Sequence, residues 1–159
     1  MPSSRMDKQH NIVKSGKEKR RAKPVLSGDT GTQFMEYRIE IEEHAGQKMV
    51  HTYIKGFLSE KDRNRIGAEA IQTMSDNNIT KSIWDVREAE LVYPLIKVHL
   101  AIVNVDVFQF KEGNYVAIIY HHNKMEFEHA KNAAYNRNIF NVGYFDSIEE
   151  GIAWLAGKE

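Results

Sequence analysis

The segment from Tyr115 to Tyr120 constrains the fold of this chain more than any other stretch, because it is almost continuously apolar. A strand with one face in water alternates apolar and polar residues, whereas a strand covered on both faces does not. The segment therefore predicts an interior strand, which favours parallel pairing. A second short, buried strand is expected between Lys81 and Val86, centred on Ile83 and Trp84.

Alternation of apolar and polar residues marks the region before these strands. Residues 34–42 and 48–56 both alternate with a period close to two, and turn residues 44–47 lie between them. Two alternating runs joined by a short turn predict an antiparallel hairpin. A last strand is expected at residues 139–145.

Capping residues followed by apolar residues at helical spacing predict helices that begin at Ser59, Asn123 and Ser147. The segment 95–110 has two interpretations. Pro94 suits the first turn of a helix, whereas residues 103–110 are rich in β-branched residues and nearly alternate, as in a strand. With a helix there, the order is ββαβαβαβα. The fold class is then α/β, with a single mixed sheet in which an N-terminal antiparallel hairpin is followed by alternating strands and helices.

Charge divides the chain of 159 residues into a tail and a body. Residues 1–30 hold eight basic and three acidic residues, for a net charge of +5, and the remainder carries −5. The first 32 residues contain too few large apolar side chains to bury, so we expect a disordered basic tail there and one domain at 33–159.

Several classes of protein are excluded by what the sequence lacks. It contains no cysteine, which rules out disulfides, thiolate catalysis and cysteine-ligated metals. No apolar run approaches the roughly 18 residues that a membrane span needs, and the N-terminus lacks the apolar core of a secretory signal. We therefore expect a cytoplasmic protein.

Three segments of the body together resemble the SpoIIAA-like branch of the STAS superfamily (sulfate transporter and anti-sigma factor antagonist). They are residues 83–89 (IWDVREA), 116–119 (VAII) and 145–155 (FDSIEEGIAWL). The resemblance covers the chain from about Phe34 onward and implies a compact α/β domain that binds protein partners or small ligands. Regulatory members of the family carry a phosphorylated serine in a turn after the central strand. The matching residues here, 87–91, contain no Ser or Thr, which argues against such a switch.

Four residues are candidates for a ligand site. Asp85 and Arg87 are expected at the carboxyl end of the central strand, where α/β sheets usually bind ligands, and both point to the same side. Arg87 can hold a carboxylate through two hydrogen bonds, although a structural ion pair with Asp85 is the simpler interpretation. His122 follows the interior strand, and Tyr93 precedes the segment 95–110.

Two further groups have a structural interpretation that outweighs a functional one. The first group resembles a metal site only loosely, since its spacing matches no zinc signature, and comprises His121, His122, Glu126 and His129. The second group consists of aromatic residues that either line an apolar pocket or fill the core, and comprises Tyr93, Phe108, Phe110, Tyr135, Tyr144 and Trp154. We accordingly expect no metal and no cofactor.

Three hypotheses for function follow. The first is a non-enzymatic, STAS-like binding or regulatory domain that acts through a protein partner, a small apolar or anionic ligand, or a second copy of the chain. The second is a small enzyme with Asp85, Arg87 and His122 at the carboxyl ends of the strands. The third is nucleic-acid association through the basic tail, a weak signal because no aromatic residues interleave with the charges.

Overall fold

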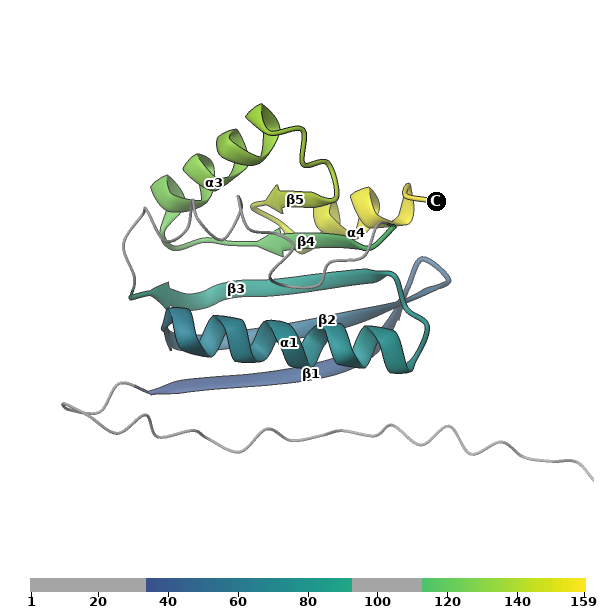
Figure 1. Cartoon of the computed structure of the whole chain (residues 1–159), viewed down its shortest axis with the longest axis horizontal. Helices are drawn as coiled ribbons and strands as arrows, with labels where there is room; N and C mark the ends of the chain where they lie inside the picture. The colour runs from purple at the N-terminus through teal and green to yellow at the C-terminus, as the bar shows by residue number, and fades with distance from the viewer. Residues whose placement is uncertain (1–33, 93–112) are drawn as a thin grey trace, which may run out of the picture.

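The apolar run after Gly113 forms β4 (Tyr115–Ile119), an interior strand of a five-stranded sheet, as predicted. The computed structural model describes residues 34–92 and 113–159. The strands lie in chain order, from β1 (Met35–His44) and β2 (Gln47–Leu58) through β3 (Lys81–Leu91) and β4 to β5 (Val142–Phe145) (Figure 1). β1 and β2 are antiparallel and every later pair is parallel, which confirms the mixed sheet.

The hairpin turn sets which side chains of β1 and β2 share a face. Ala45 and Gly46 have φ of 51° and 73°, and His44 pairs with Gln47 across them. Two successive residues with positive φ form a turn whose twist matches that of the strands. The register that follows places Glu42 opposite Met49.

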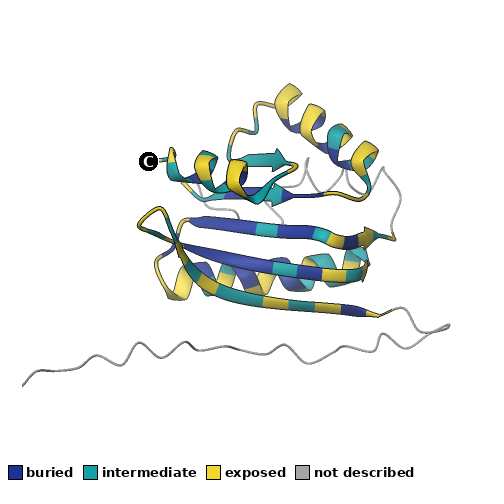
Figure 2. Ribbon diagram, turned by 180° about the vertical axis from the view of Figure 1, so that it is seen from behind, coloured by how far each residue is buried: buried dark blue, intermediate teal, exposed yellow. Residues whose placement is uncertain are grey.

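Helices cover both faces of the sheet. α1 (Glu60–Asp76) and α3 (Lys124–Asn136) lie on one face, where Ile66 and Phe127 share an apolar cluster with Ile54. α4 (Ile148–Ala156) packs against β3, β4 and β5 on the opposite face, through the buried Leu155. β1 is the least buried of the first three strands (Figure 2). Among the described residues, no helix is long and apolar enough to span a bilayer.

Two of the three predicted helix caps are confirmed. The Ser59 hydroxyl accepts a hydrogen bond from Asp62 N at 3.1 Å, and the Ser147 hydroxyl accepts one from Glu150 N at 3.3 Å. The prediction for Asn123 is wrong, because its side chain makes no cap to α3. Asn123 has a φ of 54°, and its side-chain oxygen instead accepts a hydrogen bond from Leu91 N at 3.0 Å, which holds the end of β3.

The central strand is longer than predicted. We expected it to end at Val86, but β3 continues to Leu91, which pairs with Leu58 at the end of β2. A register shift opposite Tyr53–Lys55 absorbs one extra residue of β3, after which pairing resumes. The stretch in which a phosphorylatable turn was sought is therefore a strand. The last strand is shorter than predicted, at Val142–Phe145. The basic tail and the segment 95–110 lie outside the described residues.

Candidate ligand-binding groove

Asp85 and Arg87 bind each other. Arg87 donates to the Asp85 carboxylate from Nη2 at 2.6 Å, from Nε at 2.8 Å and from the backbone N–H at 3.2 Å. Burial alone would raise the pKa of Asp85, but these hydrogen bonds outweigh it and hold the pKa below its usual value. The two residues lie inside β3 rather than at its end, so that part of the prediction is wrong. Asp85 is level with Ile119, at the carboxyl end of β4.

The other two predicted ligand residues are not joined to this pair. His122 is exposed on the loop between β4 and α3, and no described contact connects it to Asp85 or Arg87. Tyr93 lies outside the described residues. Within the loosely metal-like group, the His121 ring lies 3.2 Å from the backbone oxygen of Asp146. The described residues bring Asp85 and Arg87 together and show no contact between this pair and His122, and the site of four residues stays a prediction.

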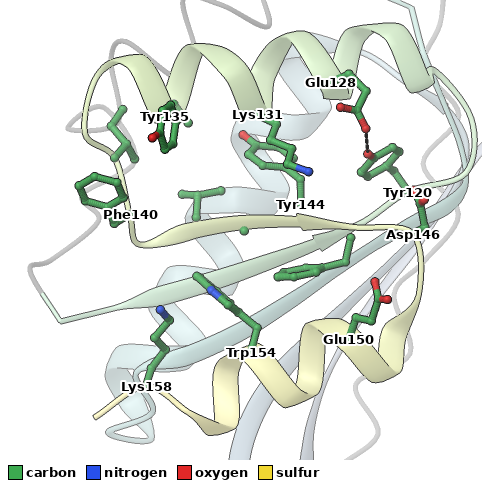
Figure 3. Close-up of a pocket in the computed structure, with 15 residues that line it drawn as sticks. Tyr120, Glu128, Lys131, Tyr135, Phe140, Tyr144, Asp146, Glu150, Trp154 and Lys158 are labelled. Carbon is green, nitrogen blue, oxygen red and sulfur yellow. Dashed lines mark hydrogen bonds between the residues drawn. The ribbon is translucent and has the colours of Figure 1, made fainter.

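A groove of about 450 Å³ lies instead along β5, between α3 and α4 (Figure 3). All four residues of β5 line it, so the groove follows the whole strand. β5 is the edge strand of the described sheet and pairs only with β4 there. The sequence folds this way because small residues of α3, Ala130 and Ala134, pack close to Tyr144 on one side of the strand.

The two ends of the groove differ in chemistry (Figure 3). One end is aromatic and basic, with Tyr135 and Phe140 exposed by 74% and 63% and the Lys158 ammonium 4.5 Å from the Trp154 ring centroid. The other end is acidic. Its polar side chains are Glu128, Asp146 and Glu150, together with the hydroxyl of Tyr120.

One acidic side chain of that end is already engaged. Tyr120 donates a hydrogen bond of 2.7 Å to Glu128 Oε1, and burial together with this carboxylate raises the pKa of the Tyr120 hydroxyl. Among the described residues, the carboxylates of Asp146 and Glu150 make no hydrogen bond or ion pair, and both residues are exposed. The free negative charge at this end therefore lies on Asp146 and Glu150.

The backbone of β5 presents alternate residues to the groove. Asn141 O accepts from Val116 N at 2.9 Å, and Phe145 O accepts from Tyr120 N at 3.1 Å, so these residues bond toward β4. In a parallel ladder, successive residues direct their N–H and C=O groups to opposite sides. The backbone groups of Val142 therefore point away from β4, along the outer edge of the sheet.

Sequence patterns indicated part of this groove. Tyr135, Tyr144 and Trp154 were among the aromatic residues considered for an apolar pocket, and they do line it. Phe140, Lys131 and Lys158 were missed. Phe140 was placed inside the last strand, and single surface lysines carry no signal that distinguishes a pocket from any solvated face.

Comparisons with known proteins concern the fold. No family model and no curated protein matches the chain. One solved structure that does match is an uncharacterized protein of the DUF3478 family from Shewanella loihica PV-4, described as having a SpoIIAA-like fold. The two chains are 17% identical, the match covers 80% of this chain and 99% of that chain, and the TM-score is 0.48. Its described fold is the one that the sequence resemblance implied.

Proposed function

We propose that the protein is a non-enzymatic binding domain that holds an extended segment of a partner protein along β5. The observation that carries this proposal is that the groove follows the whole edge strand and is flanked by a helix on each side. Extended segments commonly bind by adding a strand to an exposed sheet edge, where main-chain hydrogen bonds supply affinity and side-chain pockets supply specificity.

The lining of the groove indicates the chemistry of the partner. The exposed rings of Tyr135 and Phe140 favour apolar or aromatic side chains at one end, where Lys158 adds a positive charge. Asp146 and Glu150 favour a basic side chain at the other end. The partner segment thus carries apolar and acidic residues at one end and a basic residue a few positions along.

The other hypotheses have less support in the described residues. The carboxylate of Asp85 is occupied by Arg87, and no described contact joins His122 to either residue, so the described contacts do not support the enzyme hypothesis. Association of nucleic acid with the basic tail and a cytoplasmic location both remain predictions from composition.

The first test locates the partner by photocrosslinking in the native cell. A photoreactive phenylalanine analogue replaces Phe140 in the groove or, as a control, Ile41 of β1, which is exposed by 43%. A partner protein that crosslinks from position 140 and not from position 41 is expected. Equal crosslinking from both positions, or a second copy of the chain as the crosslinked species, would contradict the proposed partner.

The second test uses the crosslinked partner segment, purified, in a titration. Val142→Pro removes a backbone N–H that points away from β4, so the sheet tolerates it as it tolerates proline at other edge strands. Val142→Thr is the matched control, because it changes the side chain and keeps the N–H. We expect at least a tenfold loss of affinity for the proline variant alone. Wild-type affinity of a folded Val142→Pro variant would exclude strand addition at this edge.

A further inference from the structure

The β1–β2 hairpin carries a separate cluster of polar side chains. Glu42, His44 and His51 all point to the sheet face that α4 occupies further along the sheet, because the register pairs Glu42 with Met49 and His44 with Gln47. His51 comes two residues after Met49 and so shares this face. None of these residues lines the groove at β5.

The three side chains converge on one oxygen atom. Glu42 Oε2 lies 2.8 Å from His44 Nε2 and 2.9 Å from His51 Nδ1. One carboxylate oxygen and two imidazole nitrogens thus lie within 4.8 Å of one another. Two imidazoles and a carboxylate are a common zinc ligand set, and nitrogen donors also suit copper, nickel and cobalt.

We propose that Glu42, His44 and His51 form a binding site for a divalent transition-metal ion such as Zn²⁺. Zinc lies about 2.0–2.2 Å from such ligands, so donor atoms in a tetrahedral site are about 3.3 Å apart. The distances from Glu42 Oε2 to the two nitrogens are shorter than this by about 0.5 Å. Small rotations of Glu42 and His44, whose side chains are 25% and 23% exposed, provide that movement.

Neighbouring side chains hold the ligands in place without competing for the metal. Tyr53 donates a hydrogen bond of 2.7 Å to the other carboxylate oxygen, Glu42 Oε1, and its ring stacks on His51 at 3.8 Å between centroids. The Arg38 guanidinium in turn lies 3.7 Å from the centroid of the Tyr53 ring. Outer contacts of this kind orient metal ligands and strengthen binding.

Burial holds the His51 ring in one orientation and, within the part of the chain that the structure describes, leaves one of its two nitrogens unpaired. Its side chain is fully buried, and Nε2 has no hydrogen-bond partner among the described residues. An unpaired buried polar atom costs free energy and calls for an explanation. Among these residues Nε2 stays unpaired whether or not Nδ1 binds a metal, but burial against Tyr53 fixes the direction in which Nδ1 faces Glu42.

The site offers three protein ligands and leaves room for a fourth. Glu42 and His44 are partly exposed, so the side of the cluster opposite His51 faces solvent. A site with three protein ligands completes its coordination with water or with a group from another molecule. Metal binding at the hairpin does not depend on the partner groove, because none of the three ligands lines it.

The test is a titration of the full-length protein with Zn²⁺ by calorimetry, and with Co²⁺ as a probe whose visible absorption reports tetrahedral geometry. We expect one ion per chain. Glu42→Gln keeps the shape of the side chain and removes the anionic ligand, and His44→Gln removes a partly exposed ligand near the turn. Each is expected to weaken binding at least tenfold. Tyr53→Phe, which keeps the ring, is expected to weaken it about 10- to 100-fold.

His122→Gln is the matched control, because it removes an exposed histidine outside the cluster. It is expected to leave affinity and the Co²⁺ spectrum unchanged, and circular dichroism checks that every variant is folded. Absence of stoichiometric binding to the wild-type protein would overturn the proposal. So would a folded Glu42→Gln variant with wild-type affinity, or a loss in His122→Gln as large as the loss in His44→Gln.

Discussion

The two halves of the sheet differ on the face that α4 occupies. Beneath Leu155, over part of β3 and β4, this face is apolar, and Ile83, Ala117 and Ile119 are fully buried there. Over the β1–β2 hairpin the same face is polar apart from Met49, and the side chains of His44, His51 and Tyr53 are hydrogen-bonded to Glu42 there. One half is therefore held by removal of apolar surface from water, and the other by a network around one carboxylate.

The two halves also differ in how local their contacts are. Glu42 bonds to Tyr53, 11 positions along the chain, and to His51, 9 positions along. Leu155 packs on Met49, which is far away in the sequence. A hairpin can form its network as soon as its turn closes, whereas the apolar half needs almost the whole domain. The polar half therefore depends on contacts between residues near one another in the sequence, and the apolar half on contacts between distant residues.

The ionisable side chains of the hairpin network have shifted pKa values, which set their charge states. Burial lowers the pKa of the His51 ring, which favours the neutral imidazole although Glu42 opposes the shift. Burial would raise the pKa of Glu42, but hydrogen bonds from Tyr53 and His51 outweigh it and lower the pKa. Burial and the hydrogen bond to Glu42 both raise the pKa of the Tyr53 hydroxyl. Within the hairpin network, the Glu42 anion therefore faces two neutral donors, His51 and Tyr53.

The largest loss of stability is expected from a truncation in the apolar half. Leu155→Ala removes a fully buried side chain beneath which Ile83 and Ala117 pack. Such truncations leave a cavity, and we expect the free energy of unfolding to fall by about 2–5 kcal/mol in urea denaturation. Ala153→Ser, at an exposed position of the same helix, is the control and should change it by less than about 0.5 kcal/mol. Similar losses for both would mean that α4 does not stabilise the sheet through Leu155.

The second-largest loss of stability is expected from a change near the end of the hairpin half, at Gly56. Gly56 has a φ of 89°, and a Cβ there would lie 2.1 Å from the backbone oxygen of Phe34. Gly56→Ala therefore combines strain with a clash and should cost about 2–4 kcal/mol. Gly46→Ala in the turn is the control, since its φ of 73° is also positive but nothing lies within 4 Å of a Cβ. It should cost about 1 kcal/mol in the same urea titration. Equal costs would show that Phe34 moves aside freely.

A third prediction concerns the boundary between the halves, where Asp85 accepts hydrogen bonds from Arg87. Asp85→Asn should lower the free energy of unfolding by about 1–3 kcal/mol at neutral pH. The folded-state pKa of Asp85 is lowered, so its contribution is complete above the unfolded pKa of about 3.9 and is lost as the pH falls through the folded value. Urea titrations at pH 7 and pH 3 should therefore show the difference between variant and wild type shrinking in acid. A difference independent of pH would exclude the ion pair as its source.

Much of the fold was predictable because its signals are local. The alternation of β1 and β2, the apolar run of β4 and the serine caps of α1 and α4 each depend on a few neighbouring residues. The extension of β3 to Leu91 was not predictable in this way. It depends on pairing with the far end of β2 through a register shift, and the use of Asn123 to hold Leu91 depends on the same tertiary contact.

The candidate sites were less predictable than the fold. The groove combines Lys131 of α3 with Trp154 and Lys158 near the end of the chain, and only the tertiary structure brings them to one strand. The hairpin cluster had a usable signal that we missed. A two-residue turn at Ala45-Gly46 places Glu42, His44 and His51 on one face, as the period of two in each strand requires.

The smallest expected effect sharpens the contrast between the halves. Tyr53→Phe keeps the ring that stacks on His51 and removes one of the hydrogen bonds to Glu42. Because Glu42 is partly exposed and keeps its histidine partners, the free energy of unfolding should fall by only about 0.5–1.5 kcal/mol. The folded-state pKa of Glu42 should rise, since Tyr53 is a donor that lowers it, and carbon-detected NMR of the carboxylate measures this directly. A loss as large as that of Leu155→Ala would mean that the polar half is not a replaceable local network but is as tightly coupled to the domain as its apolar core.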